Sequence, residues 1–218
     1  MSKRYGDIIA LDNVNIVVED REYVCIIGPS GSGKTTLLKI IAGILEPDEG
    51  DVLVDGKSVL GVPIEERGIG LVMQDVVLFP HMNVWENIVY SPLVKGLAPR
   101  IINDIGREVT DYLTLSIDKK MYPDEISRGG QQKVALARAL ASDPKLLLLD
   151  EPLGSIDAET AKRLRFELRK LVKDLGLTAI HITHNQEEAL SIADKVVVMR
   201  KGRVEQVGKP LELYLKPR

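Results

Sequence analysis

The stretch from residue 28 to residue 36 constrains this chain more than any other part of its sequence. It places two glycines, a lysine and a hydroxyl residue at the spacing of a phosphate-binding loop, in the order Gly28-Pro29-Ser30-Gly31-Ser32-Gly33-Lys34-Thr35-Thr36. Glycines let consecutive backbone N–H groups converge on one anion, where a Cβ atom would obstruct them. The stretch therefore predicts a site for a nucleoside triphosphate.

Two side chains at the end of this loop have distinct predicted tasks. Lys34 adds a mobile positive charge to the backbone donors. Thr35 places a hydroxyl on the Mg²⁺ that bridges the outer phosphates, and the helix that begins here directs its positive dipole end toward the same anion. The loop thus predicts ATP together with Mg²⁺ as its ligands.

The flanks of the loop agree with this interpretation. Residues 23–27 form a short apolar, β-branched run that ends at Gly28, as a buried strand does. After the loop, a helix with an apolar side is predicted to end at Gly43. Its apolar positions are Leu37, Leu38, Ile40 and Ile41.

Composition limits the class of protein. The chain has 218 residues, of which 44% are hydrophobic and 28% charged, values typical of a globular α/β domain with room for an inserted subdomain. A formal net charge of −3 gives no sign of a nucleic-acid partner. Cys25 has no second cysteine to pair with, so we expect a reducing compartment and a packing role for its thiol.

Hydropathy argues against a membrane-embedded chain. No apolar run approaches the roughly 18 to 20 residues that span a bilayer, and the basic residues at the N-terminus precede no signal-peptide core. Any membrane role is therefore expected to come through a partner.

The order of patterns along the chain predicts the fold. Residues 8–27 are interpreted as strands of an edge sheet, and residues 52–59 as a hairpin that turns at Asp55-Gly56. Residues 76–141 have helical patterns broken by prolines and are predicted to form an inserted helical subdomain. After Pro144, buried strands alternate with helices, which is typical of a parallel sheet. Strands are expected at 145–150, 178–183 and 195–200, with a helix capped by Gly176 between the first two.

Together these patterns predict one α/β domain with a P-loop NTPase core and a mainly parallel sheet. The core consists of residues 1–75 and 142–218 and includes an N-terminal antiparallel β subdomain.

Two adjacent carboxylates follow the strand 146–149, at the edge where open α/β sheets bind ligands. Asp150 is expected to hold Mg²⁺, usually through water, because that ion prefers hard oxygen ligands. Glu151 is expected to polarise the water that attacks the γ-phosphate. Acids that merely end a strand are the alternative.

Further motifs follow in a fixed order. They are Gln74 in Val72-Met73-Gln74-Asp75, the run Ile126-Ser127-Arg128-Gly129-Gly130-Gln131, the run Gly154-Ser155-Ile156-Asp157, and His184 in Ile182-Thr183-His184-Asn185. With the phosphate loop and the strand ending at Glu151, they make the chain from about Tyr5 to Arg218 resemble the nucleotide-binding subunits of ATP-binding-cassette transporters. The resemblance implies an ATP hydrolase.

The resemblance also implies a head-to-tail dimer of two copies. Each ATP lies between the phosphate loop of one copy and the signature segment, Ser127 to Gln131, of the other. Ser127 and the amides near Gly129 offer donors to the γ-phosphate across the interface. By the same resemblance, Gln74 touches Mg²⁺ or the attacking water, His184 hydrogen-bonds the γ-phosphate, Asp157 links the two sites, and Tyr5 stacks on adenine.

The signature segment departs from the family pattern of leucine, serine, glycine, glycine, glutamine. Counted back without a gap from Val134, the alignment puts Arg128 at the first glycine and Gly130 at the glutamine, whereas a shift of one residue restores Gly129-Gly130-Gln131. The arginine either adds a charge-assisted phosphate contact or holds the two subunits apart and slows turnover.

Two other residues have competing interpretations. His181 and His184 have the spacing of a metal pair only on a helix, so on a strand His181 is interpreted as a packing residue. Trp85 either helps to receive a coupling helix of a membrane subunit or packs in the helical subdomain.

Finally, the resemblance is strongest to importers of sugars, polyamines or inorganic anions. It implies transmembrane permease subunits as partners, a solute-binding protein acting indirectly, and a cytoplasmic location at the inner face of the membrane. Members of this import branch often continue into a C-terminal regulatory β-domain, whereas this sequence stops at Arg218, so regulation by such a domain is not expected here. The alternative is a soluble or regulatory cassette ATPase without a transporter.

Overall fold

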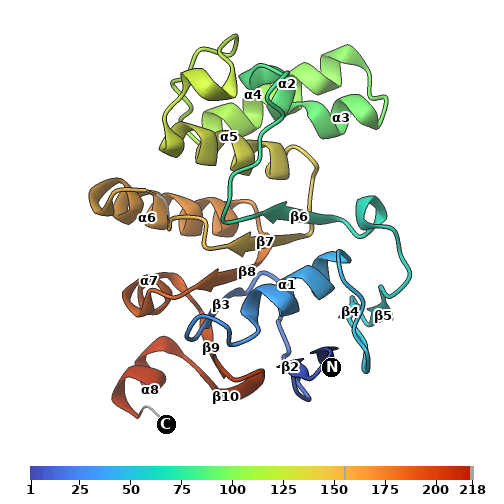
Figure 1. The fold of residues 1–218 in the computed structure, drawn as a ribbon. Helices are drawn as coiled ribbons and strands as arrows, with labels where there is room; N and C mark the ends of the chain where they lie inside the picture. Colours follow the sequence, from blue (N-terminus) through green and yellow to red (C-terminus); the bar gives the residue numbers. More distant parts are fainter. Residues whose placement is uncertain (155, 217–218) are drawn as a thin grey trace.

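The computed structural model describes residues 1–154 and 156–216. At its centre lies a six-stranded sheet with the order β10-β9-β3-β8-β7-β6, in which only the edge strand β10 pairs antiparallel among the strands described (Figure 1). The strands are β3 (Tyr23–Ile27), β6 (Ile69–Val72), β7 (Leu146–Asp150), β8 (Thr178–Thr183), β9 (Lys195–Arg200) and β10 (Arg203–Gly208). The predicted strands after Pro144 and their parallel pairing are thus confirmed.

The interior strands are apolar on both faces because both faces are covered. Along β7, Leu147 and Leu149 belong to one core cluster and Leu148 to another, as the period-two alternation of a strand requires. The first cluster contains side chains of α6 (Ala158–Asp174), α7 (Gln186–Ile192) and α8 (Pro210–Leu215). The second contains those of α1 (Lys34–Ala42), so α1 lies on the opposite face of the sheet.

The segment between β6 and β7 is helical, as its sequence indicates. Its helices gather beyond the β6 edge of the sheet (Figure 1). They are α2 (Val84–Ile88), α3 (Tyr90–Val94), α4 (Pro99–Tyr112) and α5 (Arg128–Leu140), with a 3₁₀ turn over Pro123–Glu125. Within the part of the chain that the structure describes, no helix is both long and apolar enough to cross a membrane.

Buried side chains fix this helical segment internally. The amide of Asn87, fully buried, donates to the carbonyl oxygens of Phe79, Met82 and Asn83, which closes the loop before α2. Trp85 packs so closely on Gly106 that a Cβ there would lie 2.5 Å from the indole ring. Trp85 therefore has the packing role that was one of its two interpretations.

The prediction for residues 8–27 is wrong in part. Only β2 (Ile8–Leu11) and β3 are strands: β2 pairs with β1 (Lys3–Tyr5) in a separate two-stranded sheet, whereas β3 lies inside the main sheet between β8 and β9. Arg21, just before β3, has the positive φ of 57°, which interrupts an extended chain. An apolar run buried on both faces belongs to an interior strand, which explains the position of β3.

The predicted hairpin at residues 52–59 is confirmed. β4 (Leu53–Val54) pairs antiparallel with β5 (Lys57–Ser58). The two turn residues, Asp55 and Gly56, both have positive φ, 52° and 73°, as a tight hairpin turn requires. A 3₁₀ turn over Ile64–Glu66 then leads to β6.

Candidate nucleotide-binding site

The predicted phosphate loop connects β3 to α1 at the carboxyl edge of the sheet. Two of its positions must be glycine because other backbone segments come too close for a Cβ atom to fit. A Cβ on Gly28 would lie 2.1 Å from the Met199 carbonyl oxygen, and one on Gly33 would lie 2.3 Å from that of Ala10. Gly33 also has φ +99°, a conformation that side chains other than glycine rarely adopt. The loop is therefore held between β9 and β2.

The Lys34 side chain lies inside the loop. Its ammonium donates to the carbonyl oxygens of Gly28 at 2.8 Å and Pro29 at 3.0 Å, and to the Ser32 hydroxyl at 3.3 Å. Burial lowers the pKa of Lys34, while the nearby carboxylates act in the opposite direction. The structure thus places a partly desolvated cation at the centre of the loop.

The start of α1 suits an anion. Gly33 is its N-cap, no side chain caps it, and its first turn contains no acidic residue among those described. The first N–H groups of any helix have no partner inside the helix, and the helix dipole makes that end positive. Unshared donors, a cation and glycines without Cβ atoms are the features that a triphosphate requires, so the loop fits this ligand.

Asp150 ends β7 beside the start of α1. The Thr35 hydroxyl donates to Asp150 Oδ1 at 3.4 Å, and the carboxyl is 3% exposed. Burial raises the pKa of Asp150, which the Thr35 hydrogen bond partly offsets. A desolvated carboxylate beside a hydroxyl offers the hard oxygen ligands that Mg²⁺ prefers, so this pair fits that ion.

Glu151, the next residue, faces the end of a neighbouring strand. Its N–H donates to the Ile182 carbonyl at 2.9 Å, and its φ is +45°. His184 Nδ1 donates to Glu151 Oε2 at 2.8 Å. Left-handed backbone at a residue other than glycine costs on the order of 1–3 kcal/mol and is found at functional sites. The strained turn aims this carboxylate at the histidine.

Sequence analysis missed the hydrogen-bonded side chains on either side of His184 in the chain. Thr183 lies at the centre: its hydroxyl donates to Glu188 Oε2 at 2.6 Å and accepts from the Asn185 N–H at 3.0 Å. Asn185 caps α7 by accepting from the Glu188 N–H. The Asn-x-x-Glu spacing is the sequence signal of such a cap and would have predicted a helix start after His184.

Other predicted site residues lie apart from the loop. Gln74 is exposed just after β6, Tyr5 is 46% exposed in β1, and Asp157 is the N-cap of α6, where it accepts from the Thr160 N–H. Within the described ranges, no hydrogen bond or ion pair joins these three to the phosphate loop. Ser155 lies outside the described residues.

The signature segment begins α5. Ser127 is the N-cap and accepts from the Gly130 N–H at 3.2 Å, and Arg128 is the first helical residue. The helix continues without interruption to Leu140. Gln131 donates to the Pro123 carbonyl at 2.7 Å and fixes the preceding loop, while a Cβ on Gly129 would meet no heavy atom within 4 Å.

Comparison with known proteins identifies the family. The family model described as "ABC transporter" matches residues 11–154, which contain the phosphate loop, the signature segment and both carboxylates. The chain belongs to the ABC transporter family.

Curated ABC relatives match the whole chain. It is 42% identical over 218 residues to the uncharacterised ABC transporter ATP-binding protein YdcT of Escherichia coli, 46% identical over 222 residues to the sulfate/thiosulfate import ATP-binding protein CysA of Bacillus cereus, and 41% identical over 218 residues to the spermidine/putrescine import ATP-binding protein PotA of Clostridioides difficile. The chain spans 65%, 62% and 63% of the lengths of these relatives.

Solved ABC cassettes share the fold. One is a dimeric ATP-binding cassette in a post-hydrolysis state, bound to ADP and Pi, with a TM-score of 0.84 and 30% sequence identity. A second is a dimeric bacterial ABC transporter cassette, with the same TM-score and 31% identity. Each comparison covers 96% of this chain and 95% of the solved one.

His181 of this ABC chain packs in the core, as expected. It is fully buried, hydrogen-bonds the Tyr23 hydroxyl through Nδ1 at 2.9 Å, and has Nε2 3.5 Å from Glu188 Oε1. Burial lowers the pKa of His181 to about 3. The imidazole is therefore neutral in the folded chain.

This burial predicts a pH dependence of stability. The unfolded imidazole has a pKa of about 6.5, so between about pH 6.5 and 3 the unfolded chain binds more protons at His181. The contribution of His181 to the free energy of unfolding then falls by up to about 1.4 kcal/mol per pH unit as the pH decreases. Urea denaturation at pH 7.5 and 5.0 checks this. His181→Asn should lose less stability than the parent over that interval, and equal losses would contradict the prediction.

Proposed function

We propose that the chain is the ATP-binding and ATP-hydrolysing subunit of an ABC transporter. The observation that carries this proposal is the 2.8 Å contact between Glu151 and His184 at the same sheet edge as the phosphate loop. If Glu151 merely ended the strand, neither its hydrogen bond with His184 nor its positive φ would be required. A carboxylate held by a histidine beside a triphosphate site has the arrangement of a general base.

The proposed roles follow from the donors and acceptors present. The phosphate loop, residues 28–36, and Lys34 within it bind and orient the triphosphate of ATP. Thr35 and Asp150 hold Mg²⁺, with Gln74 as a further ligand, and the ion neutralises charge on the outer phosphates. Glu151 takes a proton from the attacking water, and His184 orients Glu151 and hydrogen-bonds the γ-phosphate.

The site is proposed to be completed by a second copy. Ser127 and the Gly129 amide lie at the start of α5, whose apolar side chains belong to the core cluster opposite that of α1, and no hydrogen bond joins them to the phosphate loop among the described residues. Their donors therefore suit the ATP of the partner in a head-to-tail dimer. In the same proposal, Asp157 links the two sites of the dimer and Tyr5 stacks on adenine.

The transport role is inferred from the relatives. Two of them are named as import ATP-binding proteins, for sulfate or thiosulfate and for spermidine or putrescine. We infer that this chain powers solute import with transmembrane permease subunits and, indirectly, a solute-binding protein. It would lie at the cytoplasmic face of the membrane, with residues 76–141 as the helical subdomain that contacts the permease.

The test is MgATP hydrolysis by the purified chain over a range of protein concentrations, with Glu151→Gln as the inactive reference. Because each site needs two copies, the specific activity should rise with protein concentration. Activity that does not depend on concentration would contradict the shared site. ATP binding without turnover at any concentration, also after adding the permease, would favour a regulatory cassette.

Gly129→Ala is expected to affect the stability of the monomer and the activity of the shared site in opposite directions. Gly129 lies in α5 with open space at its Cβ position, so alanine should raise the free energy of unfolding of the monomer by about 0.5–1 kcal/mol. The same methyl group would meet the partner's ATP, so hydrolysis should fall at least about tenfold. Urea denaturation and steady-state ATPase assays measure the two effects. Unchanged hydrolysis would place the signature segment outside the site.

A further inference from the structure

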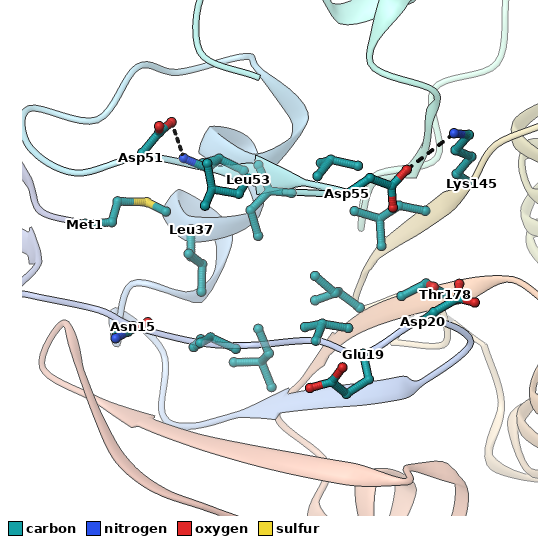
Figure 2. Close-up of a pocket in the computed structure, with 18 of the residues that line it drawn as sticks. Met1, Asn15, Glu19, Asp20, Leu37, Asp51, Leu53, Asp55, Lys145 and Thr178 are labelled. Carbon is teal, nitrogen blue, oxygen red and sulfur yellow. Dashed lines mark hydrogen bonds and ion pairs between the residues drawn. The ribbon is translucent and has the colours of Figure 1, made fainter. Parts of the chain in front are cut away.

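The two faces of β8 differ in chemistry. One face carries Thr178 and Ile180, which line a cavity of about 740 Å³ together with Leu37 of α1 (Figure 2). The opposite face carries His181 and Thr183, which are only 0% and 2% exposed. A strand in the middle of the sheet thus buries two polar side chains on the side away from α1. Buried polar groups require partners, and these two find theirs in α7.

The carboxylate of Glu188, in α7, contacts both side chains. Its Oε2 accepts from the Thr183 hydroxyl at 2.6 Å, and its Oε1 lies 3.5 Å from His181 Nε2. Burial raises the pKa of Glu188, while the Thr183 hydrogen bond and the buried Arg165 cation of α6 act in the opposite direction. The carboxylate therefore has a donor on one oxygen and a compensating cation nearby, as an ionised group inside a protein requires.

The contacts of His181 assign its tautomer. The Tyr23 hydroxyl lies 2.9 Å from Nδ1, and among the described residues neither Nε2 nor Glu188 Oε1 has a hydrogen-bond partner. A proton on Nε2 directs a donor at the carboxylate, whereas a proton on Nδ1 would leave two lone pairs facing each other. The proton therefore lies on Nε2, and Tyr23 donates to Nδ1. Both oxygens of Glu188 then face donors.

The Thr183 hydroxyl passes this constraint to the backbone beside His184. It accepts from the Asn185 N–H at 3.0 Å, and Asn185 Oδ1 accepts from the Glu188 N–H at 3.1 Å. His184 lies between these two fixed residues, and its own side chain is 63% exposed. An exposed side chain is not held by packing, so the direction in which the imidazole meets Glu151 depends on the backbone that carries it.

We propose that Thr183 and Glu188 are positioning residues for ATP hydrolysis. Glu188 holds the Thr183 hydroxyl, the hydroxyl holds the peptide group that follows His184, and His184 is thereby directed at Glu151. Their role rests on the proposed function, in which Glu151 is the base and His184 orients it. Both positioning residues are buried, so loss of their contact lowers kcat without removing a contact to ATP.

Removal of the Thr183 hydroxyl tests this contact with little change of shape. Thr183→Val should lower kcat for MgATP at least about tenfold, because a small displacement of a catalytic group costs that much or more, while the KM for ATP stays unchanged. Thr183→Ser keeps a hydroxyl and should keep kcat near that of the parent. An unchanged kcat in Thr183→Val, or a loss that serine does not restore, would overturn the proposal.

Two neighbouring acids of α7 provide a matched pair of variants. Glu188→Asp keeps the charge near Arg165 but withdraws the carboxylate from Thr183 by one methylene group, so kcat should fall at least about fivefold. Glu187→Asp makes the same change one residue earlier, where the side chain is 81% exposed and forms a surface ion pair with Arg165. Such pairs contribute little, so kcat should not change. Equal losses in the two variants would contradict a specific role of Glu188.

A spectroscopic measurement tests the positioning role independently of turnover. The chain has three histidines, so ¹⁵N-labelled histidine and long-range ¹H–¹⁵N correlation at about pH 8 give the tautomer of each imidazole. His184 should carry its proton on Nδ1, facing Glu151, in the parent and in Thr183→Ser, and should lose this preference in Thr183→Val. His181 should keep its proton on Nε2 in all three chains, which shows that they are folded alike.

The tautomer of His184 decides the outcome even where ATP is not hydrolysed. Retention of the Nδ1 proton at full population in Thr183→Val would overturn the positioning role, whatever the rate of the parent. A parent chain without turnover, in which Thr183→Val still shifts the His184 tautomer, would support the positioning contact and contradict the proposed hydrolytic function alone.

Discussion

Replacement of Glu151 by glutamine is expected to lower the rate of ATP hydrolysis by at least about a hundredfold, because removal of a general base typically costs that much or more. Glutamine keeps the size of the side chain and can still accept from His184 Nδ1, which donates to Glu151 at 2.8 Å. ATP affinity should therefore stay within about threefold of the parent. Steady-state phosphate release and equilibrium binding of a fluorescent ATP analogue measure the two quantities separately.

A surface carboxylate provides the matched control. Glu159 is exposed in the first turn of α6, and Glu159→Gln should leave hydrolysis unchanged. Turnover by Glu151→Gln at more than about a tenth of the parent rate would assign the base to another group. If Glu151→Gln instead lost ATP binding along with turnover, the carboxylate would have a structural role at the strained turn.

Gly33→Ala is expected to have the largest effect on stability. Its Cβ would lie 2.3 Å from the Ala10 carbonyl oxygen and 2.9 Å from Leu11 Cδ2, both in β2, at a φ of +99°. Either the phosphate loop or the strand must then move, at a cost of about 3 kcal/mol or more in the free energy of unfolding. Urea denaturation without nucleotide measures this loss, and ATP affinity should fall by more than about tenfold.

Substitution of Gly31, in the same loop, is the control that distinguishes the cost of a steric collision from the cost of backbone strain. Gly31→Ala has a φ of +75°, but no heavy atom lies within 4 Å of its Cβ position. It should cost only the strain of a left-handed alanine, about 1–2 kcal/mol. Equal destabilisation by both substitutions would mean that the contact of Gly33 with β2 does not constrain the loop.

The sequence predicted those elements whose signal is local. The apolar runs that became β7, β8 and β9 and the hairpin turn at Asp55-Gly56 are each encoded within a few residues. The assignment of residues 8–27 to one edge sheet failed because a strand's neighbours are chosen by tertiary contacts. Nothing within residues 23–27 says that β8 and β9, more than 150 residues later, will flank them.

In the candidate site, too, the sequence predicted the features encoded by short patterns and missed those that depend on tertiary contacts. The spacing of the phosphate loop predicts its glycines and Lys34, and a strand end predicts Asp150 and Glu151. The contact of Glu151 with His184 and the positive φ that aims it depend on how β7 and β8 are aligned, which no short pattern contains. The roles of Gln74, Tyr5 and the signature segment stay predictions, since in one chain they make no contact with the loop.

The order of strands in the sheet also determines when a growing chain can first bind nucleotide. β8 is inserted between β3 and β7, so Ile27 pairs with Thr183 on one side and Leu149 with His181 on the other. A ribosome-bound chain that ends before residue 183 therefore lacks the strand that joins the phosphate loop to the carboxylates. Contacts so distant in sequence form late. ATP is then expected to bind only nascent chains in which β8 has joined the sheet, and shorter ones stay unliganded.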